Sequence, residues 1–291
     1  MPEVGYRAHD FGSFGSASAL GERIESIRKG CIQLALNKVI PSAKPWEEWD
    51  EEYISGIRDD LLKHGVWVAM IGCYINPVHP VKEVRDMEVK RFEKSLSLAK
   101  AFGCPYVGTE TGTQNPDGGY SVYTADPKFM DVFFESLDKM LDAAEKYDSY
   151  VAIEAVARSH TMSTIERMQK MLEKYPTKRL KVIFDPVNLL PYTGIKEKDG
   201  VSLKIPSEEA EHRFVSDALD VYGDRLAAIH CKDYVIDDDG FKLGDIPALT
   251  GIFRWKAFAE ELRRRNIDVP WLLENHNPLT VKETADTIAA F

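Results

Sequence analysis

Eight short apolar runs alternate with helical patterns along the chain, and this repeat limits the possible folds more than any other feature of the sequence. Most runs are unbroken and rich in Val, Ile and Ala, which is typical of parallel strands buried on both faces. The predicted strands are residues 4–9, 31–39, 66–75, 105–109, 150–154, 180–185, 225–230 and 269–274. Between them, apolar residues at 3.6-residue spacing, as in 129–144 and 165–175, predict helices that pack against the sheet. The repeat therefore predicts an α/β fold, a closed (β/α)8 TIM barrel.

The connections at the two ends of this predicted barrel differ in length. Helix-to-strand connections are tight, at 64–65, 103–104, 148–149 and 223–224, whereas strand-to-helix connections are long, at 111–126, 186–206 and 232–254. Barrel enzymes build their active sites from the loops that follow the strands, so we expect the functional site at that end. The 291 residues are an ordinary length for one barrel, and no linker divides them. A single domain over residues 1–291 is predicted.

Charge and apolar content exclude several classes of protein. The 47 acidic residues against 37 Lys and Arg give a net charge of −10, which argues against a general nucleic-acid-binding protein. The longest apolar run, residues 66–75, is too short to span a bilayer, and the first residues do not resemble a secretory signal. The 4 cysteines are dispersed without a Cys-x-x-Cys pair, as is typical of reduced thiols. We expect a cytoplasmic protein that binds neither membranes nor nucleic acid.

Four consecutive predicted strands finish on a residue that can bind a metal ion. These residues are Glu154, Asp185, His230 and Glu274, and each follows directly on an apolar run. Neighbouring strands of a barrel lie about 4.8 Å apart, so the four ends can converge on one ion. Ordinary polar strand ends are the alternative, but a half-buried carboxylate is costly unless it is paired or metal-bound. Three carboxylates and one imidazole, without a thiolate, suit Mn²⁺, with Mg²⁺ and Co²⁺ as alternatives.

The same four residues, with the segments Ile-His-Cys-Lys-Asp at 229–233 and Phe-Asp-Pro-Val-Asn at 184–188, resemble a known family. This is the sugar phosphate isomerase/epimerase family of xylose isomerase-like barrels, which includes ketose 3-epimerases, inosose dehydratase and relatives of apurinic endonuclease. The resemblance covers nearly the whole chain. It implies that Glu154, Asp185, His230 and Glu274 hold one Mn²⁺-like ion, and that Glu154 and Glu274 are the catalytic acid/base pair.

The chemistry of such a set is that of a sugar isomerase or epimerase. A metal ion that binds a carbonyl and a neighbouring hydroxyl stabilises an enediolate as a Lewis acid. Two carboxylates on opposite faces of the reacting carbon can remove a proton on one side and return one on the other. We therefore expect a metal-dependent isomerase of carbohydrate metabolism that acts as a ketose 3-epimerase. The alternatives are an inosose-dehydratase-type lyase, the metal-binding subunit of a C-glycoside-cleaving complex, and a non-catalytic sugar-binding protein.

Further polar residues near the strand ends are candidates for substrate binding. Asn188 stands where the epimerase pattern has a substrate-contacting histidine, and this departure leaves the sugar undefined. His160 lies in the loop after the fifth strand, Glu110 follows the fourth, and His9 ends the first; each has a purely structural role as its alternative. Asp233 is expected to orient a ring N–H or a neighbouring cation beside the ligand histidine.

The expected substrate is a small sugar or polyol. Phosphate-binding barrels usually use glycine-rich backbone after strands seven and eight. Here residues 274–278 at the end of the eighth strand read Glu-Asn-His-Asn-Pro, without a glycine, which favours an unphosphorylated sugar. The oligomeric state is left open, with a homodimer or homotetramer as alternatives to a monomer.

Overall fold

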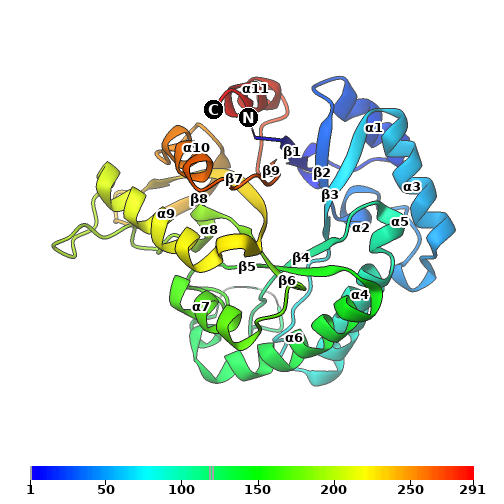
Figure 1. The fold of residues 1–291 in the computed structure, drawn as a ribbon, viewed down its shortest axis with the longest axis horizontal. Helices are drawn as coiled ribbons and strands as arrows, with labels where there is room; N and C mark the ends of the chain where they lie inside the picture. Colours follow the sequence, from blue (N-terminus) through cyan, green and yellow to red (C-terminus); the bar gives the residue numbers. More distant parts are fainter. Residues whose placement is uncertain (1, 118, 120) are drawn as a thin grey trace.

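Eight parallel strands close into a barrel in the computed structural model, which describes residues 2–117, 119 and 121–291 (Figure 1). Around the barrel the order is β1, β2, β3, β4, β5, β6, β7 and β9, and β9 pairs with β1 to complete the circle. The strands are β1 (Val4–Arg7), β2 (Gly30–Leu34), β3 (Val66–Gly72), β4 (Tyr106–Glu110), β5 (Tyr150–Glu154), β6 (Leu180–Phe184), β7 (Leu226–Ile236) and β9 (Trp271–Leu273). The predicted (β/α)8 barrel is confirmed.

Helices surround the strands on the outside of the barrel (Figure 1). They are α1 (Ala17–Glu25), α2 (Leu36–Val39), α3 (Glu51–Lys63), α4 (Lys82–Ser97), α5 (Ala99–Phe102), α6 (Lys128–Tyr147), α7 (Ile165–Lys174), α8 (Pro186–Leu189), α9 (Glu208–Tyr222), α10 (Trp255–Arg264) and α11 (Val281–Ala289). Short 3-10 turns are η1 (Ala8–Phe11), η2 (Trp46–Glu48), η3 (Val122–Ala125) and η4 (Gly223–Arg225). Several helices begin where a side-chain oxygen accepts a backbone N–H, at Ser16, Asp50, Thr164 and Ser207.

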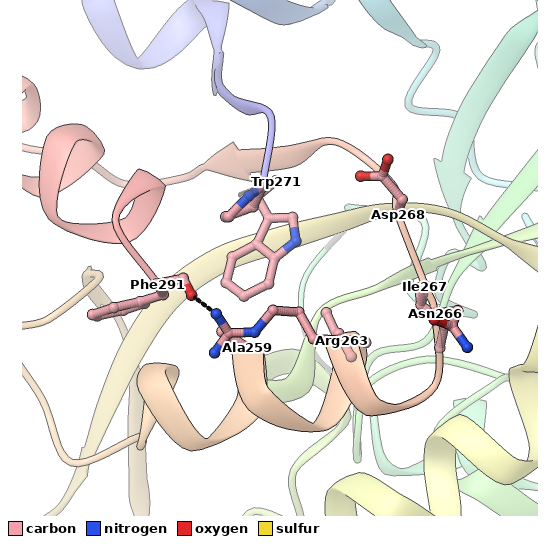
Figure 2. Close-up of a pocket in the computed structure, with 9 residues that line it drawn as sticks. Ala259, Arg263, Asn266, Ile267, Asp268, Trp271 and Phe291 are labelled. Carbon is pink, nitrogen blue, oxygen red and sulfur yellow. Dashed lines mark hydrogen bonds between the residues drawn. The ribbon is translucent and has the colours of Figure 1, made fainter.

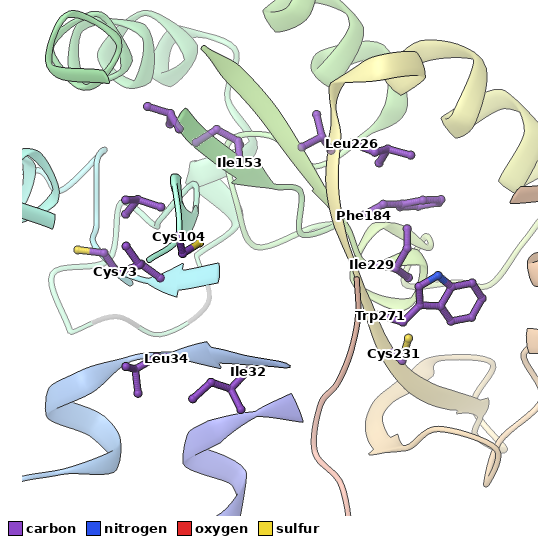
Figure 3. Packing of buried hydrophobic residues seen from close by; sticks show 14 of the residues in the cluster. Ile32, Leu34, Cys73, Cys104, Ile153, Phe184, Leu226, Ile229, Cys231 and Trp271 are labelled. Atoms are coloured by element: carbon purple, nitrogen blue, oxygen red, sulfur yellow. The ribbon is translucent and has the colours of Figure 1, made fainter. Parts of the chain in front are cut away.

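The apolar residues of the strands form two layers. The larger layer lies between strands and helices and includes Ile153, Phe184 and Ile229 (Figure 3). A smaller cluster contains strand residues that alternate with these, and four of its members are Ala152, Ile183, Ala228 and Leu272. Each of the four stands two positions before one of the predicted metal ligands, so it shares that ligand's face of the strand. We call these four residues the apolar floor, because the predicted ligands lie directly beyond them along the strands.

The second strand is shorter than predicted. Residues 31–39 were expected to be one strand, but β2 ends at Leu34 and α2 begins at Leu36. Leu36 and Val39 are both buried, three positions apart, which is the spacing of one helix face. A short unbroken apolar run does not distinguish a strand from a helical turn, and tertiary packing decided between them here.

The predicted loop 232–254 carries regular structure. Strand β7 continues to Ile236 and pairs with an antiparallel strand, β8 (Lys242–Pro247). The turn between them is organised by Asp237, whose Oδ1 accepts the N–H groups of Asp239 (3.0 Å) and Phe241 (2.8 Å), and Gly240 there has a φ of 85°. Asp and Gly in these positions favour a tight hairpin turn. The β7–β8 hairpin therefore projects from the same end of the barrel as the predicted site.

Two residues of the predicted loop 111–126, Gly118 and Tyr120, lie outside the described residues. Within the part of the chain that the structure describes, no helix combines the length and the apolar composition needed to cross a bilayer.

Candidate metal centre

The structure brings the four predicted ligands together at the carboxyl ends of neighbouring strands. Glu154 is the last residue of β5, Asp185 follows β6, His230 lies within β7 and Glu274 follows β9. All four side chains belong to residues that are at most 2 % exposed. Glu154, Asp185 and His230 each offer one ligand atom within 4.8 Å of the others. The apolar floor beneath them explains this burial, because it excludes water from the inner side of the cluster.

His230 lies between the two glutamates. Its Nδ1 is 3.1 Å from Glu154 Oε2 and 3.0 Å from Glu274 Oε1. Neither ring nitrogen has a hydrogen-bond partner of suitable geometry among the described residues, although the ring is fully buried. Buried polar atoms in native proteins are almost always satisfied, so an orphaned imidazole flanked by two carboxylates fits a site that holds a cation.

Each carboxylate has one oxygen held by another group and one left over. Asn188 Nδ2 donates to Glu154 Oε1 at 2.6 Å, which leaves Oε2 beside the imidazole. Asp185 Oδ1 accepts two backbone N–H groups at the start of α8, each at 2.8 Å, while Oδ2 has no hydrogen bond of suitable geometry from a described residue. These contacts fix the orientation of the Glu154 and Asp185 carboxylates, as the outer contacts of metal-binding sites do.

Two cations hold the remaining oxygen of Glu274. Arg7 Nη1 lies 3.1 Å from Glu274 Oε2, and the Lys232 Nζ lies 3.3 Å from the same oxygen. Lys232 also lies 3.0 Å from Asp185 Oδ2. Neither cation is among the predicted site residues. The signal for Lys232 was available: it stands two residues after His230, and the two-residue period of a strand places both on one face.

The two glutamates differ in their electrostatic surroundings. Burial raises the pKa of Glu154 to about 7. Burial also acts to raise the pKa of Glu274, but the nearby His230, Lys232 and Arg7 outweigh it and hold this pKa at about 2. For His230, burial alone would lower the pKa, and the negative charges of Glu274 and Glu154 raise it to about 9. The cluster therefore attracts a positive charge to the imidazole nitrogen.

These observations fit a divalent metal ion. Glu154, Asp185 and His230 could hold it, and Glu274 lies beside them with its Oε1 3.0 Å from His230 Nδ1. Their oxygen and nitrogen atoms are the donors that Mn²⁺, Mg²⁺ and Co²⁺ accept. The three carboxylates exceed the charge of the one buried lysine beside them, since Arg7 also pairs with Asp10. A divalent ion bound in place of the proton on His230 would balance that excess.

Four other predicted residues lie near the cluster. Asn188 contacts Glu154 as described above, and Glu110 is aligned with Glu154 across the β4–β5 pair. His160 Nε2 lies 3.5 Å from Glu110 Oε2, and its Nδ1 has no hydrogen-bond partner among the residues described. His9 packs edge-on against Tyr74, with ring centroids 5.8 Å apart. The structure thus brings these residues to the same end of the barrel as the ligands.

Asp233 lies elsewhere, although it was expected beside the ligand histidine. It is fully buried, and its carboxylate accepts the backbone N–H groups of Tyr234 (2.9 Å), Leu249 (3.1 Å) and Phe253 (3.0 Å). It therefore holds the loop between β8 and α10. The reason is strand alternation: Lys232 takes the face of His230, so its neighbour Asp233 takes the other.

Other polar residues on the β1–β3 side went unpredicted. Gln33 Nε2 donates to the Tyr74 hydroxyl at 3.1 Å, and the Lys38 ammonium lies 4.0 Å from the centre of the Tyr74 ring. Gln33 is only 1 % exposed, and its Oε1 has no hydrogen-bond partner among the described residues. A lone Gln inside an apolar strand gave no sequence signal of this role.

A separate cavity of about 350 Å³ lies at the opposite end of the barrel (Figure 2). Trp271, the first residue of β9, lines it together with Ala259 and Arg263, and Arg263 donates to the Phe291 carbonyl. Because Glu274 follows the other end of β9, this cavity does not belong to the metal cluster.

Comparisons with solved structures place the same fold in several sugar-modifying enzymes. The chain is similar to 3-keto-D-glucoside 4-epimerase from E. coli (TM-score 0.70, 14 % identity, 100 % of both chains covered). It is similar to a xylose isomerase-like TIM barrel protein from Mycobacterium smegmatis in complex with magnesium (TM-score 0.72, 14 % identity, 100 % of this chain and 96 % of that one). It also resembles a probable 3-DHS dehydratase from Bacillus anthracis (TM-score 0.68, 14 % identity, 100 % and 99 %). These identities support a shared fold only.

A comparison with curated protein sequences finds no match. The sequence profile of the xylose isomerase-like TIM barrel, however, matches residues 31–291, which is most of the chain. Together with the closed barrel and the cluster at its strand ends, this match shows that the chain belongs to the xylose isomerase-like TIM-barrel family.

Proposed function

We propose that this protein is a divalent-metal-dependent sugar isomerase that epimerises a ketose at C3. The observation that carries the proposal is the position of the two glutamates: Glu154 Oε2 and Glu274 Oε1 lie 3.1 and 3.0 Å from the same buried atom, His230 Nδ1. Two carboxylates with a free oxygen each, at one buried point, are what proton removal and proton return on a single carbon require.

The two glutamates would divide the proton transfer between them. Glu274 contacts two cations, Arg7 and Lys232, so it stays ionised and accepts the proton at Oε1. Glu154 contacts the neutral amide of Asn188 instead, and burial favours its protonated form, so it returns a proton from Oε2. In the reverse direction the two exchange roles. A bound divalent ion, with Mn²⁺ favoured, would stabilise the negative charge that develops on the substrate oxygens.

The substrate would lie between the cluster and the β1–β4 side of the barrel. Gln33, His9 and His160 each have a polar atom without a hydrogen-bond partner among the described residues. Such atoms can bind the hydroxyl groups of a small unphosphorylated sugar or polyol. We include Glu110 and Asn188 in this substrate-contacting set.

Solvent exchange tests the proposal most directly. The purified protein, loaded with Mn²⁺, would be incubated in D₂O with a panel of ketoses and inososes, and deuterium uptake at carbon would be followed by NMR. We expect uptake at C3 of a ketose, formation of its epimer, and loss of both when a chelator removes the metal. A Gln169→Leu variant serves as control, because Gln169 hydrogen-bonds to Glu173 on the exposed face of α7 and its replacement should leave exchange intact.

Two outcomes would contradict the proposal. Deuterium uptake accompanied by loss of water would favour a dehydratase, which begins with the same proton removal. Metal binding without exchange on any member of the panel would favour a sugar-binding role.

A further inference from the structure

Lys232 is a buried lysine within the predicted metal site. It is 3 % exposed, and its Nζ lies between Asp185 Oδ2 (3.0 Å) and Glu274 Oε2 (3.3 Å). The pairing of the two strands brings Lys232 close to Glu274. The backbone N–H of Glu274 donates to the carbonyl of Cys231 at 2.9 Å, and Cys231 is the residue before Lys232. Lysine is almost never fully buried unless it is paired, and here its two buried partners are themselves candidate ligands.

The contacts of Lys232 differ from those of Lys242, a partly buried lysine at the same end of the barrel. Lys242, on β8, donates its Nζ to the carbonyl oxygens of Val187 and Leu190, and no described carboxylate lies within ion-pair distance of it. Lys242 therefore fastens α8 to the hairpin. Lys232 has no such backbone contact among the described residues, and its third ion-pair partner, Asp245, is 3.6 Å away and mostly exposed.

Electrostatics gives Lys232 a specific role. Three buried carboxylates close together repel one another, and a positive charge among them relieves that repulsion. An ammonium and a divalent ion can both supply it, but they repel each other when they share the same carboxylates. The closer the lysine is held to Asp185 and Glu274, the weaker the binding of the ion.

We propose that Lys232 is the counter-charge of the metal-free site and competes with the divalent ion for Asp185 and Glu274, so that it sets how tightly the ion is held. Lys232 is thus a positioning residue that acts through the two carboxylates. The inference rests on the proposed metal site, and it adds that the site is built for reversible rather than maximal metal binding.

The test is a measurement of metal affinity and thermal stability. Mn²⁺ binding would be measured by calorimetry, with a competing chelator where needed, for the wild type and for Lys232→Met. We expect the variant to bind Mn²⁺ at least about tenfold more tightly, because it loses the competing charge. Its metal-free Tm should fall, and the rise in Tm on adding Mn²⁺ should exceed that of the wild type.

Three further variants make the result specific. Lys242→Met removes a partly buried lysine that binds backbone carbonyls and has no carboxylate partner among the described residues, so it should lower Tm and leave Mn²⁺ affinity unchanged. Lys232→Arg keeps the charge and should restore an affinity near that of the wild type. His230→Ala removes a candidate ligand and should abolish tight binding in any background.

Each outcome separates the inference from the proposed function. If the wild type binds no divalent ion, the proposed function fails. If the wild type binds Mn²⁺ and Lys232→Met binds it equally or more weakly, only the role of Lys232 is overturned. A Lys232→Met protein that folds only with Mn²⁺ supports the role, whereas one that stays unfolded at saturating Mn²⁺ overturns it.

Discussion

The two halves of the barrel mouth differ in what surrounds their buried polar atoms: on one side such atoms face groups of opposite charge, and on the other side they do not. Around β5, β6, β7 and β9, every carboxylate of the cluster has one oxygen held by a neighbour and another that faces its cationic or imidazole partner. Around β1 to β4, by contrast, Gln33 Oε1 and His9 Nδ1 have no hydrogen-bond partner among the residues described. In the half around Glu154, Asp185, His230 and Glu274, which we call the charged half, buried groups face opposite charges of the protein. The half around Gln33 and His9, which we call the neutral half, keeps unused hydrogen-bonding capacity.

This difference has a physical reason, and it suggests separate tasks for the two halves. Buried charges must be balanced inside the protein, because their desolvation costs too much to leave them unpaired. A neutral polar atom without a hydrogen bond costs less free energy than an unpaired charge, so such atoms can stay available for hydrogen bonds to a substrate. We therefore expect changes in the charged half to affect catalysis and metal binding, and changes in the neutral half to affect substrate affinity.

The largest effect is expected for the two glutamates of the charged half. Glu154→Gln and Glu274→Gln each keep an oxygen but remove the proton-transferring group, so turnover should fall by about 10² to 10⁴. Each variant should still exchange the proton of one epimer, and the two should prefer opposite epimers. Steady-state kinetics and deuterium uptake, with metal content measured in the same samples, check this.

Glu110→Gln is the matched control for these variants. Glu110 is aligned with Glu154 on the neighbouring strand but lies outside the group of possible metal ligands. Its replacement should reduce turnover far less than either of the other two. Wild-type turnover in both metal-bound glutamate variants would show that the two-carboxylate mechanism is wrong.

A smaller effect is expected in the neutral half. Gln33→Leu removes a hydrogen-bonding group that does not contact the carboxylates, so KM should rise by about tenfold, which corresponds to about 1.4 kcal/mol, with little change in kcat. Gln169→Leu, on the exposed face of α7, should change neither. A fall in kcat at constant KM for Gln33→Leu would mean that the two halves do not divide the work in this way.

The smallest effect concerns the dependence of stability on pH. Burial, with the adjacent Arg7, lowers the pKa of His9 from 6.5 to about 4, so the folded protein keeps this ring neutral while the unfolded chain takes up a proton. Acidification from pH 6.5 toward 4 should therefore lower the free energy of unfolding, by on the order of 1 kcal/mol from this group because it is partly solvated. His9→Gln should show a shallower loss between pH 7 and 5 in urea unfolding. If the free energy of unfolding of the variant falls with pH as steeply as that of the wild type, His9 does not contribute to the pH dependence.

Much of the fold and part of the site followed from local patterns. The direction of a parallel barrel, read from loop lengths, placed the four strand-end residues at one mouth, and the structure brings them together. Two predictions were wrong, one because tertiary packing decided the structure and one because strand alternation was not applied. Residues 31–39 were one apolar run whose second half became α2, and Asp233 was placed beside His230 although strand alternation turns it toward the loop amides.

The sequence by itself determined the closed barrel and which strand ends carry acidic and imidazole groups, because hydrophobic period and chain direction are local properties. Only the tertiary structure decided that Lys232 lies between Asp185 and Glu274, and that Arg7 reaches the same glutamate. The physical reason is stagger between strands. A two-residue period tells which face a side chain takes, but the residue it meets across the barrel depends on register, which is set by the packing of the whole sheet.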